Sequence, residues 1–158
     1  MSNVRALYHI VFATKFRERT ITPDREEELY SYITGIVKNQ DCYMLQINGM
    51  EDHIHILMDL HQSKALASVV ATIKRESSKW IIRNKMFPDF MGWNDEYFAA
   101  TCNVESKKNI INYIAHQKEH HHQDGFMTEI RDFYERNKME WNEHIQRGWM
   151  SKEELESM

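Results

Sequence analysis

Hydrophobic and polar residues follow two different periods along this chain, and the change of period predicts its helices and strands. Stretches rich in β-branched and aromatic residues predict strands over 4–14, 42–48, 53–60 and about 96–103. Apolar residues spaced three and four apart predict helices from Thr22 to about Asn39, over 64–85, from Glu105 to about Gln123 and from Phe126 to about Lys138. From Glu140 onward the chain is rich in Trp and charge, and its structure is poorly determined by the pattern.

Two local signals refine these boundaries. Thr22 followed by Pro23 is typical of a helix start, with threonine as the N-cap and proline at the first helical position. Asn48 and Gly49 predict a turn that joins the second and third strands as an antiparallel hairpin.

The predicted order is β-α-β-β-α-β followed by further helices. This order is typical of a ferredoxin-like α+β fold, in which two helices lie on one face of an antiparallel sheet. We expect additional C-terminal helices after that unit, and we expect the other face of the sheet to be free for a ligand or a partner. The fold by itself names no function.

The composition predicts one ordinary globular domain. The chain has 158 residues, of which 42% are hydrophobic and 28% are charged. No apolar run approaches the roughly 20 residues of a membrane span, so no membrane partner is expected. The start does not have the pattern of a signal peptide. Cys42 and Cys102 lack the spacing of a disulfide framework or a thiolate zinc site, which fits a reducing, cytoplasmic location.

The net charge argues mildly against a generic nucleic-acid binder, because such proteins are usually basic and this chain has a net charge of −4. Basic residues are nevertheless clustered at Lys15–Arg19, from Lys74 to Lys85 and at Lys107–Lys108. A local basic surface therefore stays possible.

The third predicted strand has two histidines separated by one isoleucine. Successive side chains on a strand point to opposite faces, so His53 and His55 share one face while Ile54 and Ile56 share the other. Imidazoles placed side by side in this way can bind a metal. They are also common as polar residues on an exposed sheet face, and the spacing alone does not separate the two interpretations.

The predicted helix over 105–123 offers a further ligand and a nucleophile. Tyr113 and Gln117 are four residues apart and are therefore neighbours on one helix face. Gln117 could give an amide oxygen to a metal, and the Tyr113 hydroxyl could attack a phosphate that the metal polarises. Two imidazoles and one amide oxygen suit Mg²⁺ or Mn²⁺ better than a structural zinc ion. The alternative is that Tyr113 and Gln117 serve only packing and surface.

The same helix ends in a second group of histidines, His116, His120, His121 and His122. His116 and His120 have the four-residue spacing of zinc proteases, but the order His-Glu-x-x-His is missing because Glu119 directly precedes His120. We interpret this group mainly as polar surface, with a functional contact as the alternative.

Taken together, these motifs resemble the small single-domain, single-tyrosine transposases of the HUH nuclease class, the enzymes of minimal insertion sequences. His53-Ile54-His55 resembles the His-hydrophobe-His triplet, and Tyr113 with Gln117 resembles the tyrosine helix. Four longer stretches are also similar: HIVFATKFRERTI at 9–21, SVVATIKRESSKWI at 68–81, WNDEYFAATCN at 93–103 and YIAHQKEHH at 113–121. The similarity runs from about residue 5 to about 149. It departs at Asn103 and His116, where the family commonly has glycine and asparagine.

The resemblance implies a substrate, a mechanism and a partner. The substrate would be single-stranded DNA with hairpins near the ends of an element, and the protein would work as a homodimer. Tyr113 would be the nucleophile that forms a 5′-phosphotyrosine and frees a 3′-hydroxyl, while His53, His55 and Gln117 would bind Mg²⁺ or Mn²⁺. The transposase domain would span 1–149, followed by an acidic tail over 150–158.

Two basic stretches are candidates for the DNA contacts, since charge beside an aromatic side chain suits a nucleic-acid backbone and a stacked base. They are Lys15, Phe16, Arg17 and Arg19 after the first strand, and Lys74, Arg75 and Lys79 on the helix over 64–85. On that helix a solvated surface is the alternative.

Two other functions stay open. One is a domesticated relative that nicks DNA without moving an element. The other is a non-catalytic module that binds single-stranded nucleic acid on a ferredoxin-like sheet, although the consensus signature of such RNA-binding modules is absent.

Overall fold

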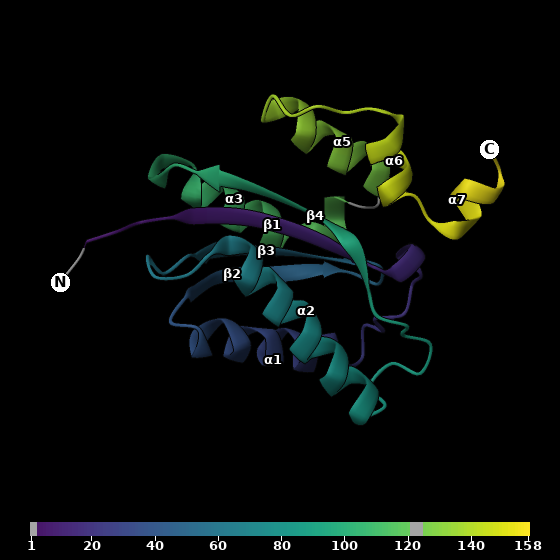
Figure 1. Ribbon diagram of the computed structural model, residues 1–158, viewed down its shortest axis with the longest axis horizontal. Coiled ribbons are helices and arrows are strands. Elements are labelled where there is room, and N and C mark those ends of the chain that lie inside the picture. The colour runs from purple at the N-terminus through teal and green to yellow at the C-terminus, as the bar shows by residue number, and fades with distance from the viewer. Residues whose placement is uncertain (1–2, 121–124) are drawn as a thin grey trace.

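The computed structural model describes residues 3–120 and 125–158 (Figure 1). Its centre is a four-stranded antiparallel sheet in the order β2-β3-β1-β4. The strands are β1 (Leu7–Thr14), β2 (Tyr43–Met50), β3 (His53–Asp59) and β4 (Trp93–Cys102). Helix α1 (Glu26–Asn39) connects β1 to β2, and helix α2 (Leu66–Arg83) connects β3 to β4. The predicted ferredoxin-like α+β fold is therefore confirmed.

Alternation along the strands divides the sheet into two faces. Ile54, Ile56 and Met58 of β3 join Ile10 and Phe12 of β1 in a core cluster with buried residues of α1 and α2. His53 and His55 point to the opposite face. The arrangement that the sequence predicts for the third strand, an apolar face and an imidazole face, is thus present.

The expectation that this second face is free is wrong. Helices α5 (Phe126–Arg136) and α6 (Glu143–Trp149) cover it, together with α3 (Lys107–Ala115), as Figure 1 shows on the side of the sheet away from α1 and α2. Val11, Ala13 and Phe98 of the sheet form a second core cluster with residues of α5 and α6. These sheet residues are apolar, so the C-terminal helices bury a surface that would otherwise face water.

Three predicted boundaries are also wrong. Helix α1 begins at Glu26 rather than after Thr22, because the Thr22 carbonyl accepts a hydrogen bond from the Arg25 N–H at 3.2 Å in a turn. The turn between β2 and β3 lies at 51–52, while Asn48 and Gly49 are paired with β3. Gly49 is needed there for close approach instead, since a Cβ atom on it would lie 2.2 Å from the His53 carbonyl oxygen.

The third wrong boundary concerns the helix predicted over 105–123. It is broken at His116, so that α3 is followed by the separate short helix α4 (Gln117–His120). Two 3₁₀ turns flank the sheet, at Lys15–Arg17 after β1 and at Val104–Ser106 after β4.

The C-terminal residues contact the rest of the domain. After α6 comes a short helix, α7 (Lys152–Glu156), which begins with a capping box between Ser151 and Glu154. Glu154 also forms an ion pair with Arg17 at 2.7 Å. Among residues 3–120 and 125–158, no helix has both the length and the apolar character that crossing a membrane requires.

Candidate active site

The two histidines of β3 lie at the centre of the covered face. His53 and His55 are both completely buried. The Nδ1 atom of His53 lies 2.6 Å from Oδ1 of Asp52, and the Nδ1 atom of His55 lies 3.0 Å from Nε2 of His9 on β1. Each ring is therefore bound at Nδ1, and its Nε2 atom lies on the opposite side of the ring.

A glutamate of α5 lies where these rings meet. Oε1 of Glu129 is 3.1 Å from Nε2 of His55 and 3.6 Å from Nε2 of His53. Its other oxygen, Oε2, accepts hydrogen bonds from the Tyr113 hydroxyl and, at 2.8 Å, from Nε2 of Gln117. Glu129 thus joins the imidazole pair to the tyrosine and the glutamine, all within one chain.

Tyr113 and Gln117 reach this point from opposite sides of the helix break. Tyr113 is a half-buried residue of α3, and Gln117 is fully buried at the start of α4. Asn48 of β2 binds the end of α3, because its Nδ2 atom donates to the carbonyl oxygens of Ile114 at 3.0 Å and Ala115 at 3.1 Å. The structure therefore brings together the four residues that the sequence predicts, although not on one continuous helix.

Burial decides the protonation of this cluster. Burial lowers the pKa of His53 to about 4, despite the opposing effect of Asp52, and lowers the pKa of His9 to about 3. Both imidazoles are therefore neutral near pH 7. Burial, together with the negative charge and hydrogen bond of Glu129, raises the pKa of Tyr113 well above its usual value. The phenol is protonated and directs its proton at Glu129.

The donor set fits a divalent cation. His53, His55 and Glu129 each offer one ligand atom, and these atoms lie within 4.8 Å of one another. The Oε1 atom of Gln117 is buried and has no hydrogen-bond partner among the residues that the structure describes. A buried amide oxygen without a partner is costly unless a ligand binds it. Imidazole, carboxylate and amide groups are ligand types for divalent cations, and Glu129 is a further candidate donor that the prediction lacked.

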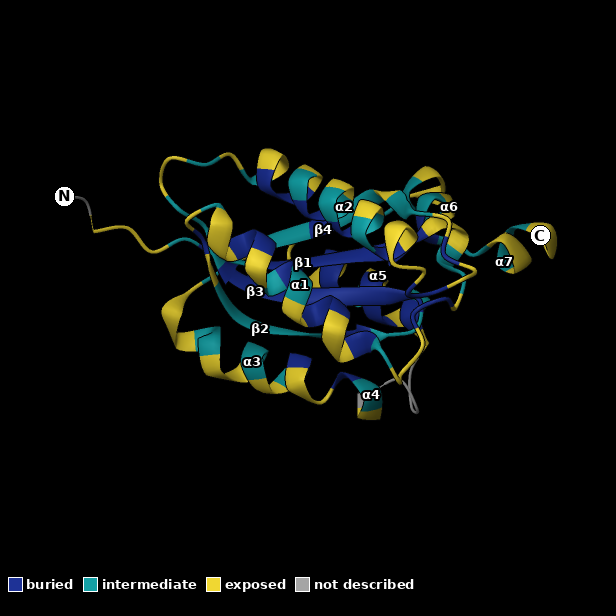
Figure 2. Ribbon diagram, turned by 90° about the horizontal axis from the view of Figure 1, so that it is seen from below, coloured by how far each residue is buried: buried dark blue, intermediate teal, exposed yellow. Residues whose placement is uncertain are grey.

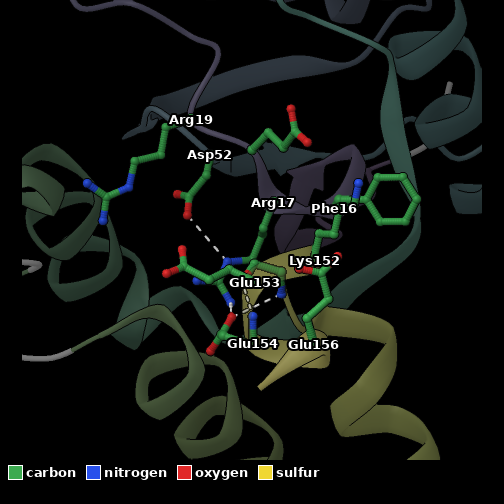
Figure 3. A pocket seen from close by; sticks show the side chains of 10 residues that line it. Phe16, Arg17, Arg19, Asp52, Lys152, Glu153, Glu154 and Glu156 are labelled. Atoms are coloured by element: carbon green, nitrogen blue, oxygen red, sulfur yellow. Dashed lines mark hydrogen bonds and ion pairs between the residues drawn. The ribbon is translucent and has the colours of Figure 1, made fainter. Parts of the chain in front are cut away.

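The loop after β1 lies beside the site. Phe16 and Arg17 have φ angles of 58° and 51°, a left-handed conformation that is rare for such side chains. Arg17 points inward between Asp52 and Glu154, as Figure 3 shows, with its Nε atom 3.3 Å from Oδ2 of Asp52. It therefore touches the carboxylate that holds His53. Burial opposes ionisation of that carboxylate, but the hydrogen bonds and charges of His53 and Arg17 hold the pKa of Asp52 at about 2.

The other predicted DNA-contact residues of this loop face solvent. Lys15, Phe16 and Arg19 are exposed. Phe16 and Arg19 line a cavity of about 600 Å³ whose far side is formed by α7, including Glu153 and Glu156. Figure 3 shows Asp52 on the side of Arg19 and Lys152 on the side of the glutamates, so side chains of both charges line each side of this cavity.

The predicted contacts on α2 lie on the other face of the sheet. Lys74 is engaged by the protein, since its Nζ atom donates to the carbonyl oxygens of Asn94, Asp95 and Glu96 at 2.8, 3.3 and 3.2 Å. Arg75 and Lys79 are exposed and both lie near Glu76. Figure 2, which views the molecule from the side of α1 and α2, shows exposed residues along this helix. Both predicted basic stretches contact the chain around the start of β4, since the Lys15 N–H donates to the Gly92 carbonyl oxygen at 2.9 Å and Lys74 donates to Asn94.

The second histidine group is described only in part. His116 is exposed, and its Nδ1 atom lies 2.7 Å from the Asn112 carbonyl oxygen at the end of α3. His121 and His122 lie outside the described residues, as does the side chain of His120. His116 thus caps a helix end at the point where the helix breaks.

The model of the family described as "Transposase IS200 like" matches residues 2–117 of this chain. The chain belongs to this family. The matched part of this IS200-like transposase runs from before β1 to the first residue of α4, so it includes His53, His55, Tyr113 and Gln117. It ends before α5, and Glu129 lies outside it. The predicted relationship to the single-tyrosine HUH transposases is confirmed.

Individual relatives agree with this assignment. The transposase for insertion sequence element IS200 of Salmonella typhimurium is 27% identical over 122 residues, which is 71% of this chain and 76% of that protein. The ISDra2 transposase TnpA of Deinococcus radiodurans is 21% identical over 116 residues, 70% of this chain and 82% of that protein.

Two solved structures have the same fold. A crystal structure described as a transposase from Deinococcus radiodurans R1 matches with a TM-score of 0.58 and 21% identity, over 74% of this chain and 95% of that chain. The structure of a REP-associated tyrosine transposase bound to a REP hairpin matches with a TM-score of 0.54 and 13% identity, over 73% of this chain and 72% of that chain.

Sequence reasoning missed two residues of the site, and each left a signal. Glu129 interrupts the apolar stripe of α5 formed by Phe126, Ile130 and Phe133, and a carboxylate on a buried helix face needs partners. His9 lies on β1 at the position that shares a face with Val11, the cross-strand neighbour of His55. In both cases the signal was a polar residue at a position where the apolar pattern of the helix or strand predicts burial.

Proposed function

We propose that this IS200-like transposase cleaves and rejoins single-stranded DNA at hairpin-marked element ends through a covalent link to Tyr113. The observation that supports this most strongly is the convergence of Tyr113, His53, His55 and Gln117 around Glu129. A tyrosine beside a cation site is the arrangement that nucleophilic attack on a phosphodiester needs. The solved REP-associated relative is bound to a hairpin, which is consistent with a hairpin substrate here.

This geometry supports a cleavage step with Tyr113 as the nucleophile. The Tyr113 oxygen attacks the scissile phosphorus, the bond from phosphorus to the 3′ oxygen breaks, and the products are a 5′-phosphotyrosine and a free 3′-hydroxyl. The phenolic proton points at Oε2 of Glu129, so this carboxylate is placed to accept it, and one proton is taken up by the departing 3′ oxygen. A Mg²⁺ or Mn²⁺ ion bound by His53, His55, Gln117 and Glu129 would polarise a phosphate oxygen.

Rejoining uses the same atoms in reverse. A 3′-hydroxyl attacks the phosphotyrosine, and the phenol leaves with a proton. Two transesterifications of this kind conserve the phosphodiester bond energy, so strand exchange needs neither ATP nor free hydrolysis. His53 and His55 are fully buried, so bulk water does not reach the two imidazoles.

We propose that the DNA strand approaches along the loop after β1. Lys15, Phe16 and Arg19 are exposed beside the site and combine charge with an aromatic ring. Arg17 supports this surface from within, and a phosphate at Arg17 would have to replace the carboxylate of Glu154. Arg75 and Lys79 on α2 would serve a second stretch of the same DNA, such as a hairpin stem, while Lys74 supports β4.

We further propose that the protein acts as a homodimer, because exchange between two element ends needs two tyrosines. Within this chain Tyr113 lies against Glu129 and His55. A second copy would supply the second tyrosine and the second pair of histidines. Light scattering at micromolar concentration should show the mass of two chains, and a monomer with and without DNA would contradict the dimer.

The function is tested with a hairpin oligonucleotide labelled on the 3′ side of the cleavage point. Wild-type protein with Mn²⁺ should form a labelled adduct that survives denaturing electrophoresis. Tyr113→Phe should bind the oligonucleotide and form no adduct, and His53→Ala should form none because the cation site is lost. Tyr43→Phe, which changes an exposed tyrosine of β2, is the matched control and should behave as wild type. Wild-type adduct formation by Tyr113→Phe would refute the assignment.

A further inference from the structure

His9 is a third buried histidine, and no step of the proposed reaction uses it. It lies on β1, is only 6% exposed, and has its ring 5.2 Å from the ring of His55, with the two rings 26° from parallel. The rings of Phe98 and Phe133 lie against it at 6.1 and 5.0 Å. A titratable ring in such apolar surroundings is unusual unless a specific partner compensates its burial.

The partner of His9 is a predicted metal ligand. Nε2 of His9 lies 3.0 Å from Nδ1 of His55, and the Nε2 atom of His55 lies 3.1 Å from Glu129 on the opposite side of the ring. His55 is therefore bound at both ring nitrogens, one toward the interior of the sheet and one toward the cation position.

The other histidine of the site has the same arrangement with a different partner. Asp52 binds Nδ1 of His53 at 2.6 Å, and Nε2 of His53 faces Glu129. A carboxylate can only accept, so the proton of His53 is on Nδ1 and its Nε2 atom presents a lone pair. Groups that bind the second nitrogen of a metal-bound histidine fix both the tautomer and the ring orientation.

We propose that His9 is a positioning residue for His55, holding the ring so that Nε2 presents its lone pair to the metal, as Asp52 does for His53. This inference rests on the proposed function only in taking His55 as a metal ligand. Without a cation, Oε1 of Glu129 accepts from Nε2 of His55 at 3.1 Å, and His9 donates to Nδ1. When His55 binds a cation through Nε2, its proton is on Nδ1, and Nε2 of a neutral His9 accepts the hydrogen bond. His9 itself touches neither the cation nor the DNA.

Asp52 and His9 differ in the charge that they bring to the site. The Asp52 side chain brings a negative charge, which Arg17 balances at 3.3 Å. His9 orients its ligand without adding charge to a site that already holds Glu129. A neutral acceptor therefore fixes His55 while leaving the total charge around the cation unchanged.

The test compares two polar replacements of His9. In glutamine the terminal amide oxygen can occupy the place of Nε2, whereas asparagine is too short and mimics Nδ1. We expect His9→Gln to retain Mn²⁺ affinity within about threefold, and His9→Asn and His9→Leu to weaken it by about 10- to 100-fold, the range for lost partners of metal-bound histidines. His144→Leu, at an exposed histidine of α6, should have no effect.

Mn²⁺ affinity is measured by titration calorimetry or electron paramagnetic resonance, with thermal unfolding of each metal-free variant alongside. A second readout is the ¹⁵N spectrum of the imidazole rings during a Mg²⁺ titration: the proton of His55 should move to Nδ1 at a lower Mg²⁺ concentration in wild type than in His9→Leu. A purely structural role for His9 would lower the melting temperature of both polar variants equally and leave the affinities equal.

Wild-type Mn²⁺ affinity in His9→Asn and His9→Leu would overturn the proposal, and so would an equal loss in His9→Gln. If wild-type protein binds Mn²⁺, loses it in His53→Ala and yet forms no DNA adduct, the proposed function fails while the role of His9 stands. If wild-type protein binds no Mn²⁺ at all, His9 has no metal ligand to orient and this inference fails as well.

Discussion

Replacing Trp149 with alanine tests whether the C-terminal helices are part of the catalytic domain. Trp149 is completely buried at the end of α6, and its ring lies 5.6 Å from that of Phe126. Phe126 in turn lies 4.5 Å from the ring of His53. The indole Nε1 atom of Trp149 donates to the Tyr134 hydroxyl at 3.0 Å. One side chain thus connects α6 to α5 and, through Phe126, to the predicted metal site.

The expected loss of stability is large. Truncating a fully buried tryptophan to alanine costs about 3–5 kcal/mol, because apolar surface is no longer buried and a cavity is left behind. The lost hydrogen bond to Tyr134 adds about 1 kcal/mol. A decrease of about 4–6 kcal/mol is a large part of the roughly 5–15 kcal/mol that a typical domain has. In a chain of this size it corresponds to a melting temperature lower by about 8–24 °C.

The assay is urea unfolding of the metal-free protein, followed by circular dichroism. Trp141→Ala is the matched control, since Trp141 belongs to the same C-terminal segment but is only half-buried, and it should cost clearly less than Trp149→Ala. Removing residues 150–158 should cost only about 1 kcal/mol, because the Arg17–Glu154 pair is partly exposed, as expected for a tail outside a 1–149 domain. A loss below about 1 kcal/mol for Trp149→Ala would refute the packing described here.

Three further predictions concern the site and its surface. Glu129→Gln should weaken Mn²⁺ binding by at least about tenfold because an anionic donor is lost. Glu135→Gln, at an exposed glutamate of α5, is the control and should leave Mn²⁺ affinity unchanged. Equal Mn²⁺ affinities in the two variants would contradict the role of Glu129 as a ligand. The free energy of unfolding of the metal-free protein should be constant above about pH 6.5 and fall toward pH 4, by on the order of 1 kcal/mol per pH unit for each histidine. The cause is that the lowered pKa values of His9 and His53 leave the unfolded state binding more protons than the folded state. Urea titrations that give the same free energy of unfolding between pH 7 and 5 would contradict this. Arg19→Ala should reduce the log–log salt slope of single-strand binding by about 0.7, measured by fluorescence anisotropy, while Arg5→Ala at the opposite end of β1 should leave it unchanged; an unchanged slope in both would remove the loop from the DNA surface.

The ferredoxin-like unit could be predicted because its elements have strong periods. The alternation around His53 and His55 determines both the imidazole face and the apolar face of β3, and a one-residue shift would reverse them. The helices α1 and α2 have long apolar stripes, so their existence was evident even though the start of α1 was misplaced. Boundaries depend on local hydrogen bonds such as the one between Arg25 and Thr22, which no period reveals.

The packing of the C-terminal helices on the sheet face of His53 and His55 could not be predicted from periodicity. Helices α6 and α7 have seven and five residues, which is too short for a period to emerge. The burial of α6 depends on Trp149, whose partners lie on α5 and in the loop after β1. Such long-range contacts depend on the tertiary fold and not on local sequence.

The site residues that could be predicted are those whose spacing in the sequence determines their distance in space. The residues that could not be predicted are brought to the site by the tertiary fold. Tyr113 and Gln117 are one helical turn apart, so they stay close even across the break at His116. Glu129 enters from α5, twelve residues after Gln117, and its position is set by how α5 packs on the sheet. Charge beside the aromatic ring of Phe16 predicts Arg17 as a DNA contact, and the structure places its guanidinium between Asp52 and Glu154.

The central claim is that the DNA becomes attached to Tyr113, and mapping the attachment by mass spectrometry tests it most directly. A hairpin oligonucleotide is incubated with the protein and Mn²⁺, the adduct is digested with trypsin and nuclease, and the modified peptide is sequenced. Cleavage after Lys108 and Lys118 releases a ten-residue peptide, NIINYIAHQK, in which Tyr113 is the only tyrosine. We predict a nucleotide 5′-phosphate on that tyrosine. A nucleotide on any other residue, or DNA cleaved with no peptide modified, would contradict the mechanism.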